Sequence, residues 1–520
     1  MPPTSRVSTQ FPLLALPDPC LLVVLQCCAA DDLRSLFSAA RAHSRLHQAA
    51  ALALSSVKLL MRPQQQADSV LLYLDRHGSH VNSLELRVPQ DSGLKLHQLA
   101  PALQLHSLEL SGWEVQLQPG KGFQGVLGAA AAAGPPPLKQ LRLDFCTLLD
   151  GAEGLAAALL QLPALEHISL WCNMSAGVLD DYLRFPTAVL QQMQQLTCLE
   201  LSAVTLQGLE ETAPALPPLQ PLQALTRLVD LRVMRCYFKI SITASMLSGM
   251  CHLTRLTLKE VGFEPAALAG KAKLQHLELI GWRLPPAGGA AGVAQLLSQL
   301  QQQTQLTHLD LDDSMRAREE RNPPAAAYAA LTAISKLQHL DIWGCTVPAS
   351  VWQHLFPVGR QLLHLTSLDV SHARQLPDIA APPWQDRLAA PEGSRIVSCC
   401  PSLQSLSISS LQYSPQQLLQ LQGLSGLHTL RLATGPGQAD TGETLHAVGQ
   451  LTGLRKLGLY VDEAPTQLLI TQLQQLQQLP HLTSLYYGTE GLREVELKQE
   501  VSWIFLHGSS SVCVCVSLPR

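Results

Sequence analysis

The order of apolar and polar residues repeats along most of this chain. A clear copy lies near the middle, where Leu306, Leu309 and Leu311 form the pattern apolar-x-x-apolar-x-apolar. Because side chains alternate between the two faces of a strand, this pattern predicts a short strand with one buried face. A single strand of this kind cannot cover its own apolar face. Recurrence at intervals of tens of residues therefore predicts a solenoid of stacked strand-containing units.

The pattern can be aligned in fifteen successive copies, at intervals of 21 to 38 residues. Between the strands, some segments have helical periodicity, such as Val293, Leu296, Leu297 and Leu300 at i, i+3, i+4 and i+7. The copies begin at Val81, Leu105, Leu138, Leu165, Leu196, Leu228, Leu253, Leu274, Leu306, Leu337, Leu365, Leu403, Leu427, Leu454 and Leu482.

This motif and its period resemble those of the leucine-rich repeat family, over about four-fifths of the chain. The resemblance implies an α/β fold, a horseshoe-shaped solenoid with a parallel concave sheet and a mixed helical convex side. In that family the ninth repeat position carries Asn or Cys, and here Cys146, Asn173, Cys236 and Cys345 occupy it. We expect these side chains to turn inward and to bond neighbouring backbone, so we assign the cysteines among them no chemistry.

The N-terminal segment has a different pattern. Asp18 and Pro19 favour the first turn of a helix over 20–28, and Asp31 and Asp32 can cap a second helix. The segment resembles an F-box, the module of cullin-type ubiquitin ligases that binds a Skp-type adaptor, although the tryptophan usually found late in that module is absent. The alternative is a helical cap over the first repeat, which solenoids need in any case. The resemblance implies adaptor contacts at Leu16, Pro17, Leu21, Leu22 and Leu25.

These patterns divide the chain into five segments. We expect a disordered N-terminus over 1–11, an F-box-like helical module or cap over 12–61, and a linker or first cap helix over 62–80. The repeat array then occupies 81–487, and 488–520 form a tail or C-terminal cap.

Composition removes several classes of function. The net charge of −4 provides no overall positive potential that would attract nucleic acid. The sequence has no uninterrupted apolar run of about 18 residues, so a membrane-spanning helix is not expected. The 13 cysteines are odd in number and lack zinc-site spacing, so reduced thiols in the cytoplasm or the nucleus are expected. No phosphate loop, dinucleotide fingerprint, H-E-x-x-H or nucleophile elbow occurs, so we expect a binding protein, not an enzyme, with no cofactor.

Candidate binding residues lie at positions 3, 5 and 7 of each repeat, which point to the concave face. Position 5 carries an acid in four successive repeats, from Glu278 to Asp369. An ordinary solvated face explains polar residues there, but like charges on adjacent strands cost free energy, which favours a basic peptide or protein substrate as partner. Metal binding is not predicted, because a ladder lacks a shell that fixes ligand geometry. The candidates are His276, Glu278, His308, Asp310, Asp312, His339, Asp341, Trp343 and Asp369.

Together these features favour a protein-interaction module. The resemblances imply a substrate-recognition subunit of a Skp-cullin-F-box ligase, with the transfer chemistry in other subunits. A non-ligase scaffold or interaction protein is the alternative, and a secreted repeat protein is a third.

Overall fold

The structure is a computed structural model of the full chain, which divides into two compact units, residues 1–228 and 229–520. Each unit is described by itself. The description covers residues 16–31, 42–53, 56–61, 70–72, 74, 81–89, 92–96, 99, 105–116, 137–149, 151–171, 184–207, 220–235, 241–282, 289–312, 323–348, 350–371, 373–375, 392–409, 413–434, 441–461, 476, 479–488 and 514–516.

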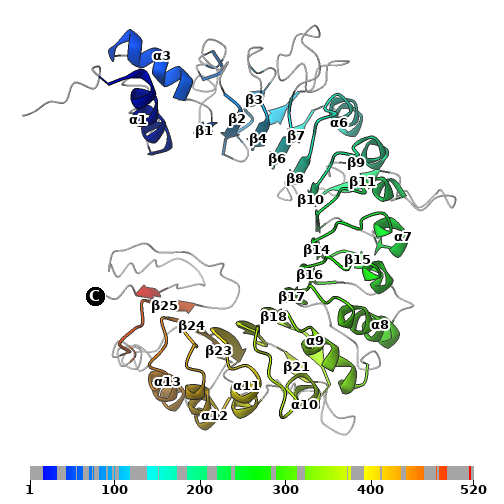
Figure 1. Ribbon diagram of the computed structural model, residues 1–520, viewed down its shortest axis with the longest axis vertical. Helices are drawn as coiled ribbons and strands as arrows, with labels where there is room; N and C mark the ends of the chain where they lie inside the picture. Colours follow the sequence, from blue (N-terminus) through cyan, green and yellow to red (C-terminus); the bar gives the residue numbers. More distant parts are fainter. Residues whose placement is uncertain are drawn as a thin grey trace, which may run out of the picture. The chain divides into compact units, whose positions relative to one another are not determined.

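Unit 1 begins with a pair of helices, α1 (Asp18–Asp31) and α3 (Ser44–Ala53), which pack against each other (Figure 1). Leu21 and Leu25 are 0% and 1% exposed and belong to the apolar core of this region. The Arg45 guanidinium on α3 donates to the Asp18 carboxylate at 2.5 Å and to the Leu16 carbonyl at 2.8 Å. Helix α1 extends to Asp31, so that residue ends the first helix instead of capping a second one.

A parallel ladder of strands follows in unit 1. Each strand pairs in register with the next, so equivalent repeat positions lie side by side, as Glu85 and Glu109 do. The strands of this ladder are β1 (Ser56–Leu60), β2 (Ser83–Arg87), β4 (Ser107–Ser111), β6 (Gln140–Asp144), β8 (His167–Trp171) and β10 (Cys198–Ser202).

The ladder starts one repeat earlier than the sequence predicts. Strand β1 pairs in parallel with β2, although we expected the array to begin at Val81 and placed 56–60 in the helical module. Leu54, Val57 and Leu59 form the same apolar pattern as the later copies. The pattern was hidden because it directly follows the apolar end of α3.

A second layer covers the back of the unit 1 ladder. It contains α6 (Gly151–Leu160) and the 3-10 turns η5 (Thr187–Gln192) and η6 (Gln220–Ala224). Two small parallel sheets complete this layer. They consist of β3 (Lys95–Leu96), β5 (Glu114–Val115) and β7 (Thr147–Leu148), and of β9 (Arg184–Pro186) with β11 (Thr205–Gln207).

Unit 2 continues the same construction. Its parallel ladder ends at β25, with which β26 pairs antiparallel, so part of the tail acts as a closing strand. In order, the ladder contains β12 (Asp230–Met234), β14 (Arg255–Lys259), β16 (His276–Ile280), β17 (His308–Asp310), β18 (His339–Asp341), β20 (Ser367–Asp369), β22 (Ser405–Ser409), β23 (Thr429–Thr434), β24 (Lys456–Val461), β25 (Ser484–Gly488) and β26 (Val514–Val516).

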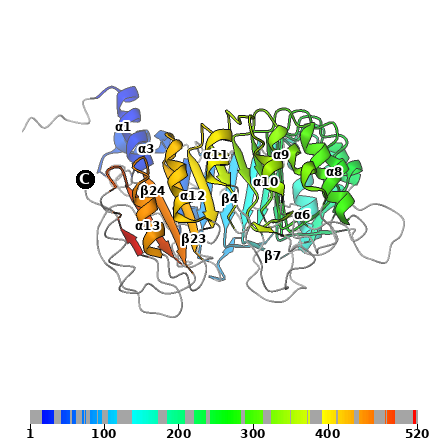
Figure 2. The ribbon, with the colours of Figure 1, turned by 90° about the horizontal axis from the view of Figure 1, so that it is seen from below.

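Helices lie along the outside of the unit 2 strands, and neighbours such as α11, α12 and α13 pack side by side (Figures 1 and 2). The four apolar residues of the predicted helix over 293–300 are at most 1% exposed within α8. The outer elements are α7 (Ala244–Leu247), η7 (Pro265–Leu268), α8 (Gly289–Gln301), η9 (Ala325–Tyr328), α9 (Ala329–Ala333), α10 (Val351–Leu355), α11 (Gly393–Cys399), α12 (Pro415–Gln420), η11 (Leu421–Gly423) and α13 (Thr441–Gly449), with the short strands β13 (Ser241–Ile242), β15 (Gly262–Phe263), β19 (Thr346–Val347) and β21 (Arg374–Gln375).

The fifteen predicted repeat starts are all confirmed, because a ladder strand begins at the third position of every copy. Each unit is therefore a parallel-stranded α/β solenoid, as expected. At the ninth position, the Cys345 thiol donates to the Leu311 carbonyl at 3.0 Å, and the Cys146 thiol to the Leu110 carbonyl at 3.3 Å. The structural role predicted for these two cysteines is confirmed, while Asn173 and Cys236 lie outside the described residues.

Among the described helices, none combines the length and the apolar character needed to cross a bilayer.

Candidate functional site

The candidate site lies on four successive strands of unit 2: β16, β17, β18 and β20. Their pairing puts His276, His308 and His339 in one row across the strands. The same register forms a second row from Glu278, Asp310, Asp341 and Asp369. The residue between the two rows on each strand is a fully buried leucine, so the rows share the opposite, half-buried face.

The three histidines stack. The ring centroids of His276 and His308 are 3.9 Å apart with an interplanar angle of 10°, and those of His308 and His339 are 4.0 Å apart at 5°. Parallel strands in register place identical side chains about 4.8 Å apart at the backbone, and these rings lean slightly together to stack. Burial, together with the neighbouring imidazoles, lowers the pKa of His308 from 6.5 to about 3, and burial likewise lowers the pKa of His339. His308 is therefore neutral at physiological pH.

Each aspartate of the second row accepts a hydrogen bond from the backbone two residues further on. Asp310 Oδ1 accepts from the N–H of Asp312 at 2.8 Å, and Asp341 Oδ1 accepts from the N–H of Trp343 at 2.8 Å. In the same way, Asp369 Oδ1 accepts from the N–H of Ser371 at 2.9 Å. Strands β17, β18 and β20 end at these aspartates, so each carboxylate organises the turn that follows its strand.

Burial and mutual repulsion disfavour the charge on this row. Burial, and then the charges of Glu278 and Asp369, raise the pKa of Asp310 to about 6, against the hydrogen bond from Asp312. Burial, and then the charges of Asp369 and Asp310, raise the pKa of Asp341 well above its ordinary value. Burial also raises the pKa of Asp369, although hydrogen bonds from Ser371 oppose the shift. A positive charge close to the row would lower these pKa values and stabilise the ionised carboxylates.

Two acids of unit 1 at the same repeat position, Glu85 and Glu109, form ion pairs with bases. Glu85 pairs with Lys58 at 2.8 Å and with Arg87 at 2.6 Å, and Glu109 pairs with Arg87 at 2.9 Å. Within the part of unit 2 that the structure describes, no lysine or arginine forms an ion pair with Asp310, Asp341 or Asp369. Glu85 and Glu109 therefore differ from these three aspartates, although the charge of Arg431 opposes the rise that burial causes in the pKa of Asp369.

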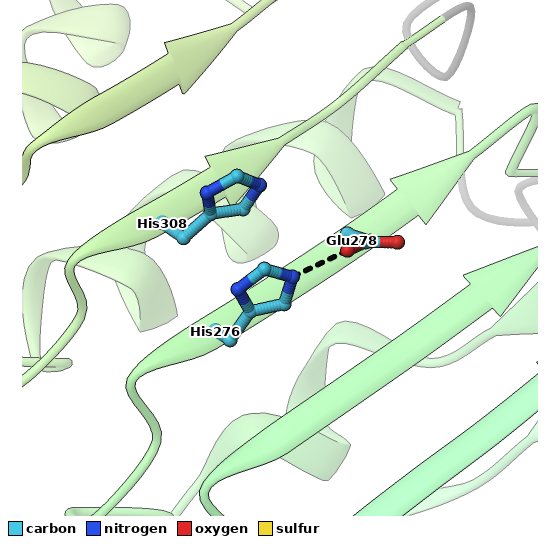
Figure 3. A group of neighbouring side chains, drawn as sticks. All are labelled: His276, Glu278 and His308. Carbon is cyan, nitrogen blue, oxygen red and sulfur yellow. Dashed lines mark hydrogen bonds and ion pairs between the residues drawn. The ribbon is translucent and has the colours of Figure 1, made fainter. Parts of the chain in front are cut away.

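At one end of the rows, three potential metal ligands come together (Figure 3). His276 Nε2 donates to Glu278 Oε1, and His308 stacks beside His276 from the next strand. One ligand atom from each of the three residues lies within 4.8 Å of the other two. Burial raises the pKa of Glu278, but the hydrogen bond and charge of His276 outweigh this effect, so the pKa is lowered overall. We predicted no metal ligands here, because a ladder of strands supplies ligands without a shell that fixes their geometry.

The remaining predicted residues lie at the edges of the two rows. Asp312 and Trp343 follow the ends of β17 and β18, half-buried in the turns. Sequence reasoning missed Ser371, whose hydroxyl donates to Asp369 at 2.6 Å, and Ser407, whose hydroxyl donates to that of Ser371 at 3.2 Å. The sequence could have identified them, because Ser371 occupies position 7 and Ser407 position 5 of neighbouring repeats, and both positions point to the concave face.

At the N-terminal helices, the structure corrects part of the predicted adaptor surface. Leu21 and Leu25 are buried, so they are not accessible contact residues. Their side chains belong to the core because they fall one helical turn apart on the inner face of α1. Leu16 and Leu22 are half-buried and Pro17 is exposed, so these three remain accessible.

Comparison with known proteins adds little to this picture. The sequence matches no family model, and it matches no curated protein. An internalin of Listeria monocytogenes has a TM-score of 0.35 and 15% sequence identity, covering 76% of this chain and 85% of its own. A leucine-rich repeat protein of Leptospira interrogans has a TM-score of 0.37 and 17% identity, covering 85% of both chains. The solenoid assignment rests on the register of this chain's own strands.

Proposed function

We propose that this protein is a binding protein whose carboxylate row, Glu278, Asp310, Asp341 and Asp369, receives a lysine- or arginine-rich segment of a protein partner. The observation that carries the proposal is the contrast between the units. In unit 1, Glu85 and Glu109 form ion pairs with Lys58 and Arg87. Among the described residues of unit 2, no lysine or arginine forms an ion pair with Asp310, Asp341 or Asp369, although Glu278 pairs with His276 and the charge of Arg431 acts on Asp369. A cationic partner supplies the missing charge, because desolvated like charges on adjacent strands repel one another.

The geometry of the row suits an extended segment. Successive strands lie about 4.8 Å apart, so four carboxylates cover roughly 14 Å. An extended peptide rises about 3.3 Å per residue, so alternate side chains recur at about 6.6 Å. Basic side chains at alternate positions therefore reach the carboxylates at both ends and in the middle of the row.

The experiment measures binding of a fluorescent peptide with alternating arginines to the full-length protein by anisotropy. A glutamate-substituted peptide serves as the sequence control. The double variant Asp341→Asn and Asp369→Asn should lose about ten-fold or more in affinity, and the wild-type affinity should fall with added salt. The matched control is Glu85→Gln with Glu109→Gln in unit 1, which should bind as the wild type does. Equal affinity of both double variants and the wild type would refute the proposal.

We propose that the N-terminal helices bind a Skp-type adaptor. The protein would then act as a substrate-recognition subunit of a cullin-type ligase in the cytoplasm or the nucleus. Its support is the exposure of two apolar side chains on α1, Val23 and Val24, which are 58% and 36% exposed. Large apolar side chains exposed on a helix favour a docking surface. Cys20, Cys251, Cys399 and Cys400 form no disulfide, which suits a reducing compartment.

The alternative is a non-ligase scaffold in which these helices cap the array. Its support is the short connection from α3 to β1 and the burial of Leu21 and Leu25 within the helix pair. Co-purification with a Skp-type adaptor distinguishes the two functions. Ligase function requires that Pro17→Ala combined with Val23→Asp abolishes co-purification while the helical circular dichroism persists. If no adaptor co-purifies with the wild-type protein, the result refutes ligase function and supports the scaffold function.

A further inference from the structure

We propose that His276, Glu278 and His308 form a binding site for a transition-metal ion, with Zn²⁺ as the best-suited metal. Two imidazole nitrogens and one carboxylate oxygen are a donor set that zinc accepts in proteins. Magnesium and calcium prefer sites made of oxygen ligands, so the two histidines argue against them. The site goes beyond peptide binding by the carboxylate row. The two proposals share Glu278, but the metal site is argued from the gathering of His276, Glu278 and His308.

The backbone holds the three ligands in place before any ion arrives. His276 and Glu278 are two residues apart on β16, so both side chains emerge on the same face. The pairing of β16 with β17 places His308 directly beside His276. Because all three side chains stand on strands of a continuous ladder, little conformational freedom is lost when an ion binds.

His339 lies next to this cluster without belonging to it. Its ring stacks on His308 with 4.0 Å between centroids, on the side away from His276. It is not among the three residues whose ligand atoms gather within 4.8 Å. It therefore provides a control for the loss of a stacked ring without the loss of a ligand.

Coordination requires the two rings to rotate out of their stack. Two nitrogens bound to one tetrahedral zinc ion lie about 3.4 Å apart, given Zn–N bonds of about 2.0–2.1 Å. The ligand atoms already lie within 4.8 Å of one another, but lone pairs in nearly parallel ring planes do not meet at one point. Each ring therefore turns about its side-chain bonds until one of its nitrogens points to the shared ion. The ion takes the place of the proton that His276 Nε2 now shares with Glu278 Oε1.

The surroundings favour a cation and leave room for it. Asp310 lies beside Glu278 in the strand register, so a metal ion reduces the repulsion between these two carboxylates. The side chains of His276 and Glu278 are 19% and 26% exposed, so an ion can reach them from solvent. Three protein ligands leave a fourth position open to water or to a ligand atom from a partner.

The test is a calorimetric titration of metal-free, full-length protein with Zn²⁺ alone. The variants are His308→Gln and Glu278→Gln, and the matched control is His339→Gln, which removes a ring from the same stack without removing a ligand. Because the chain also has 13 cysteines and other histidines, the measured quantity is the difference between proteins. Circular dichroism of each variant confirms that the solenoid is folded.

The expected result is that His308→Gln and Glu278→Gln lose one equivalent of bound zinc, or bind it about ten-fold or more weakly, while His339→Gln stays within a few-fold of wild type. The Co²⁺ difference spectrum between wild type and His308→Gln should show visible d–d bands without a thiolate charge-transfer band. Equal binding by all four proteins overturns the proposal, as does an equal loss in His339→Gln. Peptide binding is tested with Asp341 and Asp369 variants outside the cluster, so either proposal can fail alone.

Discussion

Replacing Asp341 with Asn is expected to stabilise unit 2 at neutral and alkaline pH. Asp341 lies between Asp310 and Asp369 in the ladder and carries a pKa raised by burial and by the charges of both neighbours. Asparagine has nearly the same shape, and its Oδ1 can still accept the hydrogen bond from the Trp343 N–H. The substitution therefore removes charge and leaves the turn intact.

The magnitude follows from the neighbouring pKa shift. The pKa of Asp310 rises from 3.8 to about 6, and a rise of roughly two units corresponds to about 3 kcal/mol at pH values above both pKa values. Two charges roughly 5 Å apart repel by about 3 kcal/mol at an effective dielectric constant of about 20, which gives the same scale. Solvent screening reduces both figures, so we expect Asp341→Asn to raise the free energy of unfolding by about 1–3 kcal/mol at about pH 8.

The sign of the pH dependence is fixed by the direction of the shift. In the window between the ordinary aspartate pKa and the raised pKa of folded Asp341, the folded state binds more protons than the unfolded state. The free energy of unfolding therefore falls as the pH rises through that window, and it reaches its full decrease above the raised pKa. At about pH 4, wild type and variant should differ little, and the gap should widen toward about pH 8.

Urea titrations at both pH values, followed by tryptophan fluorescence and circular dichroism, measure the effect. Repeat arrays can unfold in steps, so the comparison uses the transition assigned to unit 2. Glu109→Gln in unit 1 is the control, because Glu109 occupies the same repeat position but pairs with Arg87 at 2.9 Å. It should lose up to about 1 kcal/mol at about pH 8. Destabilisation by Asp341→Asn, or an equal gain at both pH values, would refute the electrostatic reasoning.

Two further predictions concern the framework. Gly112 has φ +78°, and an added Cβ would lie 2.4 Å from the Val88 carbonyl oxygen, so Gly112→Ala should destabilise unit 1 by about 3 kcal/mol or more. Gly270 has φ +75° with nothing within 4 Å of an added Cβ, so Gly270→Ala should destabilise unit 2 by only about 1–2 kcal/mol. Equal shifts of the urea midpoint in the two variants would show that the contact between the added Cβ and the Val88 carbonyl at position 112 has no effect. Cys345→Ala should cost about 1–2 kcal/mol, because it removes the bond to the Leu311 carbonyl and opens a small cavity, and an unchanged thermal midpoint would show that this thiol contributes nothing.

The sequence by itself determined the architecture. The spacing of Leu306, Leu309 and Leu311 and its fourteen counterparts placed every predicted ladder strand, because strand alternation is a local property that a short stretch encodes. The ninth-position pattern likewise identified Cys146 and Cys345 as framework residues. The first repeat was missed at β1, where the apolar end of a helix obscures the start of the pattern.

Tertiary structure alone decided what the residues between the leucines do. The sequence predicted that Asp310 and Asp341 share a face, but their turn-forming hydrogen bonds and raised pKa values depend on burial and on neighbours about 30 residues away. The same holds for Leu21 and Leu25, whose spacing fits an exposed or a buried helix face equally well. A local pattern fixes which face a side chain takes. Its partners, solvation and charge come from residues that only folding brings beside it.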